Sequence, residues 1–109
     1  MSFRFVFEIK VRPGEDDAFI EQWREGSKPI QEYDGARGTR LHKKRGQEHT
    51  YIAIAEWESI EKRAAAMTDI EAGESERAKR VRRWGRNEDY GVVTILGEID
   101  EIVTVLPPQ

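Results

Sequence analysis

The stretch "TYIAIAEW" (50–57) constrains the fold more than any other, because it alternates like a strand and both of its faces are mainly apolar. One face carries two aromatic rings separated by two alanines, and the other carries two isoleucines. The first face consists of Tyr51, Ala53, Ala55 and Trp57, and the second of Ile52, Ile54 and Glu56. A sheet with apolar residues on both sides needs a cover on each side.

Two further strands are predicted before this one. Residues 3–11 alternate with phenylalanine, isoleucine and valine at every odd position. Residues 36–44 form the first arm of a hairpin with "HTYIAIAEW" (49–57), and Gly46 lies at the tip of the turn. The apolar stretch 91–106 predicts one long strand or two, with Gly97 as a break or bulge.

Helical periodicity appears in three segments. The first covers about 15–33, where Pro29 predicts a kink or an early stop. The second follows Ser59, a good N-cap residue, through "IEKRAAAM". The third is expected within "ESERAKRVRRW" (74–84). The order strand, helix, strand, strand, helices, strand predicts an α+β fold of the ferredoxin-like split βαββαβ type in one domain, residues 1–109. Its antiparallel sheet has helices on a single face.

The hairpin turn predicts a register. If "RGQE" closes it with Arg45 opposite Glu48, His42 faces Tyr51, Arg40 faces Ala53, and Ala36 faces Trp57. His42, Arg40 and Gly38 then share the helix-covered face with the two alanines. Leu41 falls on the uncovered face with Ile52 and Ile54.

The alanines allow two interpretations of the helix-covered face. Gly38, Ala53 and Ala55 leave space that Trp57, Tyr51 and His42 rim, as a small-molecule site requires. Alternatively, large helix residues such as Trp23, Phe19 or Met67 fill that space and make a packed core.

The uncovered face predicts a partner. It carries Leu41, Ile52 and Ile54 together with the apolar terminal strand 91–106, and the chain has no helix left to cover them. A second copy of the sheet is the simplest cover, so a two-fold symmetric homodimer is expected, with a monomer as the alternative.

Composition excludes several classes of function. The chain has 38% hydrophobic and 36% charged residues, which predicts a soluble folded protein, and no apolar run reaches the roughly 20 residues of a membrane span. It has no cysteine, which excludes disulfides and thiolate chemistry and fits a cytoplasmic protein. The net charge of −3 argues against nucleic-acid or membrane partners. Neither histidine has metal-ligand spacing to carboxylates, so no metal site is expected.

The basic run "RAKRVRRWGR" (77–86) has two interpretations. On a helix its charges surround an apolar stripe and are mostly solvated. One arginine, Arg77 or else Arg80 or Arg83, is a candidate to reach over a pocket and pair with an anionic substrate.

The residues "VRPGEDDAFIEQWREGSKPIQEYDGARGTRLHKK" followed by "YIAIAEWES" resemble the antibiotic biosynthesis monooxygenase (ABM) superfamily over about residues 3–67. The resemblance implies a dimeric α+β-barrel. In quinone-forming members, which need no metal or flavin, O₂ oxidises a deprotonated phenolic substrate.

The resemblance carries over to only two catalytic positions. Trp57 matches the strand-end tryptophan, and His42 matches a histidine that is a candidate proton acceptor. The asparagine of the quinone-forming enzymes is Ala53 here, and their helix tyrosine falls at or near Arg63. The helical histidine of heme-degrading members is missing.

The resemblance therefore implies a cofactor-independent monooxygenase that acts on a phenolic or enolic aromatic metabolite. Its expected catalytic residues are His42 and Trp57, and its expected substrate contacts are Tyr51, Ala53, Ala55, Trp23, Arg40 and Arg77. The alternative from another class is a dimeric, non-catalytic module that binds a small aromatic ligand. A heme-degrading enzyme is the less favoured third interpretation.

Overall fold

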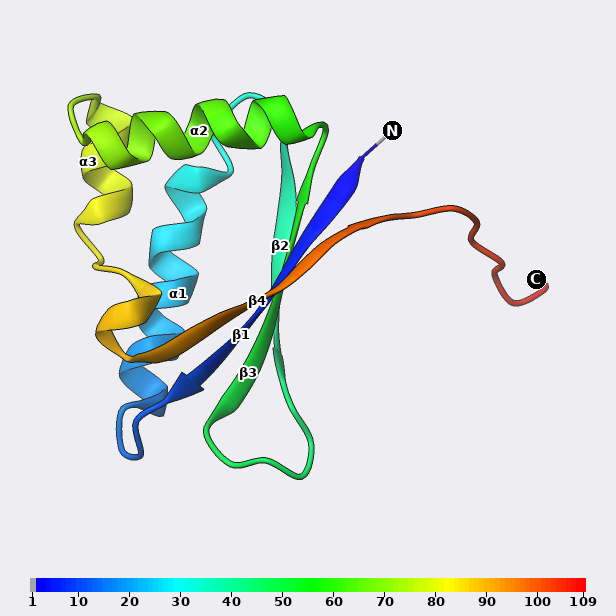
Figure 1. Ribbon diagram of the computed structural model, residues 1–109, viewed down its shortest axis with the longest axis horizontal. Coiled ribbons are helices and arrows are strands. Elements are labelled where there is room, and N and C mark those ends of the chain that lie inside the picture. The colour runs from blue at the N-terminus through cyan, green and yellow to red at the C-terminus, as the bar shows by residue number, and fades with distance from the viewer. Residues whose placement is uncertain (1) are drawn as a thin grey trace.

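The computed structural model describes residues 2–109, which form one four-stranded antiparallel sheet with all its helices on one side (Figure 1). The strand order β2-β3-β1-β4 is that of the ferredoxin-like fold, so the predicted fold class is confirmed. The elements in chain order are β1 (Phe3–Val11), α1 (Asp16–Ile30), β2 (Ala36–Lys43), β3 (Thr50–Trp57), α2 (Ile60–Ala72), α3 (Glu76–Arg82), the short 3₁₀ helix η1 (Asn87–Asp89) and β4 (Gly91–Asp100). None of the helices in 2–109 is long and apolar enough to cross a membrane.

Local sequence signals set the helix boundaries. Pro29 lies in the last turn of α1, which ends at Ile30, as its position predicted. The hydroxyl of Ser59 accepts a hydrogen bond from the backbone N–H of Lys62 at 3.1 Å and so caps α2. Gly73 ends α2 in the left-handed conformation, at φ 69°, which an L side chain adopts only with strain.

The core between the sheet and the helices has two parts. Around Phe19, which is fully buried, the core contains Ile9, Val11, Tyr51 and Ala53. Around Trp57, the core contains Phe3, Tyr33, Ala66 and Val81. The odd-numbered residues of β1 contribute to both parts, as the alternation of that strand predicted.

The predicted hairpin register is wrong by one residue over most of its length. His42 pairs with Ile52 and Leu41 pairs with Ala53, although Ala36 pairs with Trp57 as predicted. The connection is wider than a closed "RGQE" turn and places His49 at φ 58°. A bulge in β2 between Ala36 and Thr39, where Gly38 has a φ of 102°, shifts the pairing by one residue. Ala36 therefore pairs with Trp57, as the predicted register has it.

This register exchanges the two faces of β2. Thr39 and Leu41 lie on the helix-covered face, whereas Arg40 and His42 lie on the uncovered face. Leu41 therefore does not belong to the uncovered apolar surface, although it was predicted to lie there.

The last strand is shorter than the predicted 91–106. β4 ends at Asp100, and residues 101–109 are exposed and belong to no helix or strand. The bulge predicted at Gly97 is confirmed, because the pairing of β1 with β4 shifts between Val6 and Phe7. Figure 1 shows the segment that follows β4 leaving the sheet on the side opposite the helices.

The uncovered sheet face remains strongly apolar. Val6, Ile52 and Ile54 lie side by side at its centre, because Val6 pairs with Ile54. Other large apolar side chains are more than half exposed along β4 and the terminal segment. They are Val92, Leu96, Ile99, Ile102, Val103, Val105 and Leu106, whereas Ile95, also exposed, pairs with Phe7 and belongs to the helix-covered face.

Candidate functional site

The sheet and the helices enclose a hollow of about 340 Å³, here called the interlayer cavity. Its walls are mainly aromatic and aliphatic, which suits a flat apolar ligand, and its size lies in the range of small-molecule sites. Among its lining residues are Phe5, Phe7, Ala55 and Trp57 from the sheet and Trp23, Met67 and Ile70 from the helices.

Small side chains explain why the interlayer cavity stays open. Ala55 pairs with Phe5 on one side and with Thr39 on the other, so β3 offers little bulk at its centre. On the helix side, α1 contributes Gly26 to the wall. The indole of Trp57, the last residue of β3, is almost completely buried and lines the cavity.

The two alanines of β3 therefore differ in their surroundings. Ala55 lines the interlayer cavity, whereas Ala53 has no exposed surface and packs in the Phe19 part of the core. The open space of one interpretation is therefore found at Ala55 and the packed core of the other at Ala53, and ligand binding stays a prediction. Trp23 and Met67 line the cavity without filling it.

The arginines at the interlayer cavity are not the predicted ones. Arg77 lies against the ring of Tyr33, with its guanidinium carbon 4.9 Å from the ring centroid, and does not line the cavity. Arg80 forms a two-pronged ion pair with Glu32 at 2.7 Å. The arginines that do line the cavity are Arg63, Arg82 and Arg86.

Two of these three arginines have protein partners. Arg82 donates to the carbonyl oxygens of Ile70 at 3.2 Å and Glu71 at 2.8 Å, and thereby satisfies the C-terminal end of α2. Arg86 pairs with the Glu71 carboxylate at 3.2 Å. Arg63 instead stacks on Phe5, with its guanidinium carbon 3.7 Å from the ring centroid.

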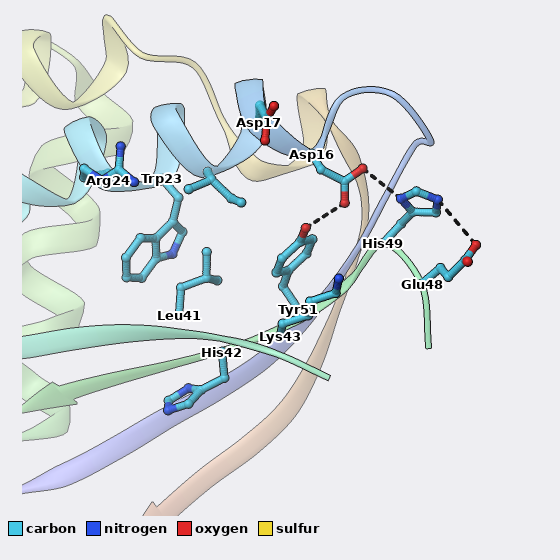
Figure 2. Close-up of a pocket in the computed structure, with 11 residues that line it drawn as sticks. Asp16, Asp17, Trp23, Arg24, Leu41, His42, Lys43, Glu48, His49 and Tyr51 are labelled. Carbon is cyan, nitrogen blue, oxygen red and sulfur yellow. Dashed lines mark hydrogen bonds and ion pairs between the residues drawn. The ribbon is translucent and has the colours of Figure 1, made fainter. Parts of the chain in front are cut away.

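His42 lies outside the interlayer cavity. Its pairing with Ile52 turns the imidazole toward the uncovered sheet face. Figure 2 shows the ring pointing away from α1, while Leu41 and Tyr51 point toward it. The predicted grouping of His42 with Trp57 is therefore wrong, and Arg40 is displaced in the same way.

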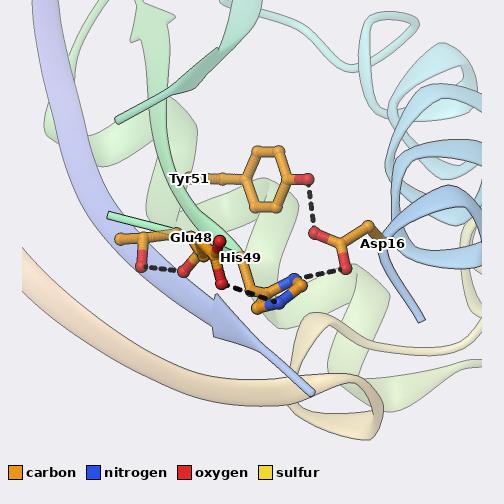
Figure 3. A network of polar contacts seen from close by, with 5 residues as sticks. Asp16, Glu48, His49 and Tyr51 are labelled. Atoms are coloured by element: carbon orange, nitrogen blue, oxygen red, sulfur yellow. Dashed lines mark hydrogen bonds and ion pairs between the residues drawn. The ribbon is translucent and has the colours of Figure 1, made fainter. Parts of the chain in front are cut away.

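A second hollow, of about 750 Å³, lies beside the β2–β3 connection and is here called the hairpin groove (Figure 2). Trp23 and Leu41 form part of its apolar wall, and His42 reaches its rim. At one end, Asp16 accepts a hydrogen bond from the Tyr51 hydroxyl at 2.6 Å. The other oxygen of Asp16 lies 2.8 Å from Nδ1 of His49 (Figure 3).

The Asp16 network is a brace between α1 and the hairpin. Burial, together with the neighbouring Asp16 carboxylate, raises the pKa of Tyr51 to about 12, so this hydroxyl stays protonated at neutral pH. The hydrogen bond from Tyr51 lowers the pKa of Asp16, and the bond to His49 adds to that effect. An acceptor carboxylate and a protonated phenol hold the start of α1 against β3.

Removing the Tyr51 hydroxyl should change how stability depends on pH. A tyrosine whose pKa is higher in the folded than in the unfolded state stabilises the fold fully below about pH 10, and this contribution is lost as pH rises toward 12. Tyr51→Phe should therefore lower the free energy of unfolding by about 1–2 kcal/mol at pH 8. The difference from wild type should shrink between pH 10 and 12. Urea unfolding at several pH values measures both effects, and a difference that stays constant through pH 12 would contradict this role.

Comparison with known proteins concerns the family and the fold of this chain. The family model for antibiotic biosynthesis monooxygenase matches residues 2–72, which contain both arms of the hairpin, Trp57 and all of α2. None of the curated proteins matches this sequence.

Solved structures resemble the whole fold. SnoaB, a cofactor-independent oxygenase from Streptomyces nogalater, is 17% identical, with a TM-score of 0.71 over 95% of this chain and 96% of its own. A putative antibiotic biosynthesis monooxygenase from Bordetella bronchiseptica is 13% identical, with a TM-score of 0.73 over 94% of this chain and 98% of its own. At these identities the likeness concerns the fold, and the family model adds the membership. The chain belongs to the antibiotic biosynthesis monooxygenase family.

Proposed function

We propose that this protein is a cofactor-independent monooxygenase that oxidises a phenolic or enolic aromatic metabolite in the interlayer cavity. The observation that carries the proposal is an unfilled cavity with aromatic walls, lined by Trp57, in a chain of this family. The SnoaB structure, described as a cofactor-independent oxygenase, supports the reaction class.

The reaction balances without a further reductant. The ionised substrate supplies the electrons to O₂, one oxygen atom enters the reacting ring carbon as a carbonyl, and the other leaves as water with two hydrogens from the substrate. Trp57, Phe5 and Phe7 hold the ring system and exclude water from it. The proton lost when the substrate ionises passes to water at the cavity rim, where Glu88 is exposed, and an equivalent proton returns to the oxygen atom that leaves as water.

Oxygen uptake with 1,8-dihydroxyanthrone as the probe tests this proposal. Trp57→Phe should lower the turnover number roughly tenfold or more, because the smaller ring positions the substrate less well. His42→Ala should leave turnover unchanged, since its ring lies on the other sheet face. Uptake that does not exceed the uncatalysed rate, or that is lost in His42→Ala alone, would contradict the proposal.

The proposal includes a homodimer. Ile52 and Ile54, with β4 and the segment that follows it, form the surface that a second copy would cover. Leu41, which was predicted to belong to this surface, lies on the opposite face and takes no part.

A non-catalytic binding module is the second candidate. It is favoured by Ala53, which stands where quinone-forming members carry an asparagine and is sealed in the core. Such a module would bind the aromatic probe in the interlayer cavity and consume no oxygen. Heme handling ranks third, because α2 lacks the histidine that heme-degrading members use.

A further inference from the structure

We infer that Arg63 forms an anion subsite in the interlayer cavity, selecting aromatic ligands that carry an anionic oxygen, either a carboxylate or an ionised hydroxyl. The inference deepens the proposed function by naming the charge of the ligand. It rests on the position of Arg63, its lack of a protein partner and the stacking geometry of its guanidinium group.

Arg63 lines the interlayer cavity beside apolar side chains. It projects from α2 over the ring of Phe5, and Met67 lines the cavity one helical turn further along. Burial lowers the pKa of its guanidinium group, and Glu98 opposes that change. Arginine nevertheless stays charged in proteins, so the cavity contains a partly desolvated positive charge.

That charge forms no contact ion pair within residues 2–109, because no carboxylate lies within 4.0 Å of the Arg63 guanidinium and Glu98, whose charge acts on it, lies beyond that distance. Its side chain also makes no hydrogen bond in this part of the chain. Arg82 and Arg86, on the same cavity, are both satisfied by groups at the end of α2. A half-buried cation without a partner is costly, and an anionic ligand would offset that cost.

The stacking geometry leaves the donors of Arg63 available. The guanidinium carbon lies over the Phe5 ring, 3.7 Å from its centroid, and the N–H groups of a guanidinium point outward from its edge in its own plane. Such an edge can donate two parallel hydrogen bonds to a carboxylate, or one short bond to a phenolate. A flat aromatic ligand that packs against the ring wall would bring its anionic oxygen to this edge.

The first test compares 2-naphthoate with its neutral analogue 2-naphthamide by quenching of tryptophan fluorescence, at neutral pH and without oxygen. Wild-type protein should bind the carboxylate at least about tenfold more tightly than the amide. Arg63→Gln should remove this preference and Arg63→Lys should retain part of it. Arg83→Gln is the matched control, because Arg83 is exposed and lines neither hollow.

The second test distinguishes the phenolate from the carboxylate. Titration of bound 4-nitrophenol, followed by the visible absorbance of its anion, should give a pKa about one unit below that of the free phenol in wild type. The shift should vanish in Arg63→Gln. A charge preference with naphthoate alone identifies a carboxylate site, and a shifted phenol pKa identifies a site for ionised hydroxyls.

The inference is overturned if wild type shows neither effect, or if Arg63→Gln weakens naphthoate and naphthamide equally, as a purely structural arginine would. Neither probe requires oxygen. An Arg63-dependent charge preference without oxygen uptake would therefore reject the monooxygenase and keep the anion subsite. Oxygen uptake without an Arg63-dependent charge preference would keep the monooxygenase and reject the anion subsite.

Discussion

Ala55→Leu should weaken ligand binding in the interlayer cavity strongly while leaving the fold intact. The larger side chain would project from the centre of β3 into the space between Phe5 and the helices. A ligand that must displace it loses about 1–3 kcal/mol, which corresponds to a roughly tenfold to hundredfold weaker affinity. Titration with 2-naphthoate measures this loss.

The matched control for this variant is Ala65→Leu, the same substitution at an exposed position of α2. It should bind the ligand as wild type does, because Ala65 does not line the interlayer cavity. Unchanged affinity in Ala55→Leu would place the ligand elsewhere, and the hairpin groove would be the next site to examine.

Ile54→Asp should convert the proposed dimer to a monomer. Ile54 lies at the centre of the uncovered sheet face, beside Val6. Two-fold symmetry buries this position in both copies, and each unpaired buried charge costs about 3–5 kcal/mol. Light scattering at micromolar concentration should show a dimer for wild type and a monomer for the variant.

Ile60→Asp is the matched control for Ile54→Asp. Ile60 is exposed at the start of α2, where an acidic residue favours the helix dipole, so this variant should stay dimeric. A monomeric wild type, or a dimer that survives Ile54→Asp, would contradict an interface at this face. The apolar segment 101–106 would then need a different cover.

The elements of the fold were predictable because their signals are local. Alternation in 3–11, the cap at Ser59 and the stop at Pro29 each depend on a few neighbouring residues, and each is confirmed. The sequence order of helices and strands was then sufficient for the ferredoxin-like topology.

The site was less predictable, because the face on which a strand residue lies depends on a one-residue register. The hairpin connection that places His49 at a positive φ left no clear signal in "RGQEH", so His42 and Arg40 were assigned to the wrong face. The β2 bulge at Gly38 shifts the register back between Thr39 and Ala36, and this is why the predicted pairing of Ala36 with Trp57 is correct.

Arg63 was missed for a different reason. The basic run 77–86 drew attention to α3 through its charge density, but charge density does not show which arginine has a partner. Arg80 is held by Glu32 and Arg77 lies against Tyr33, whereas the single arginine near the start of α2 reaches the cavity. The available signal was the position of Arg63, where the family resemblance leads one to expect a tyrosine.

The three tryptophans offer the most direct test of the central claim, that the interlayer cavity is the ligand site. Trp57 lines only the interlayer cavity, Trp23 lines both hollows, and Trp84 lines neither. Their indole N–H resonances should be followed by NMR while 2-naphthoate is added. We expect Trp57 and Trp23 to shift together and Trp84 to stay in place. A shift of Trp23 while Trp57 stays unchanged would place the ligand in the hairpin groove and contradict the proposed site.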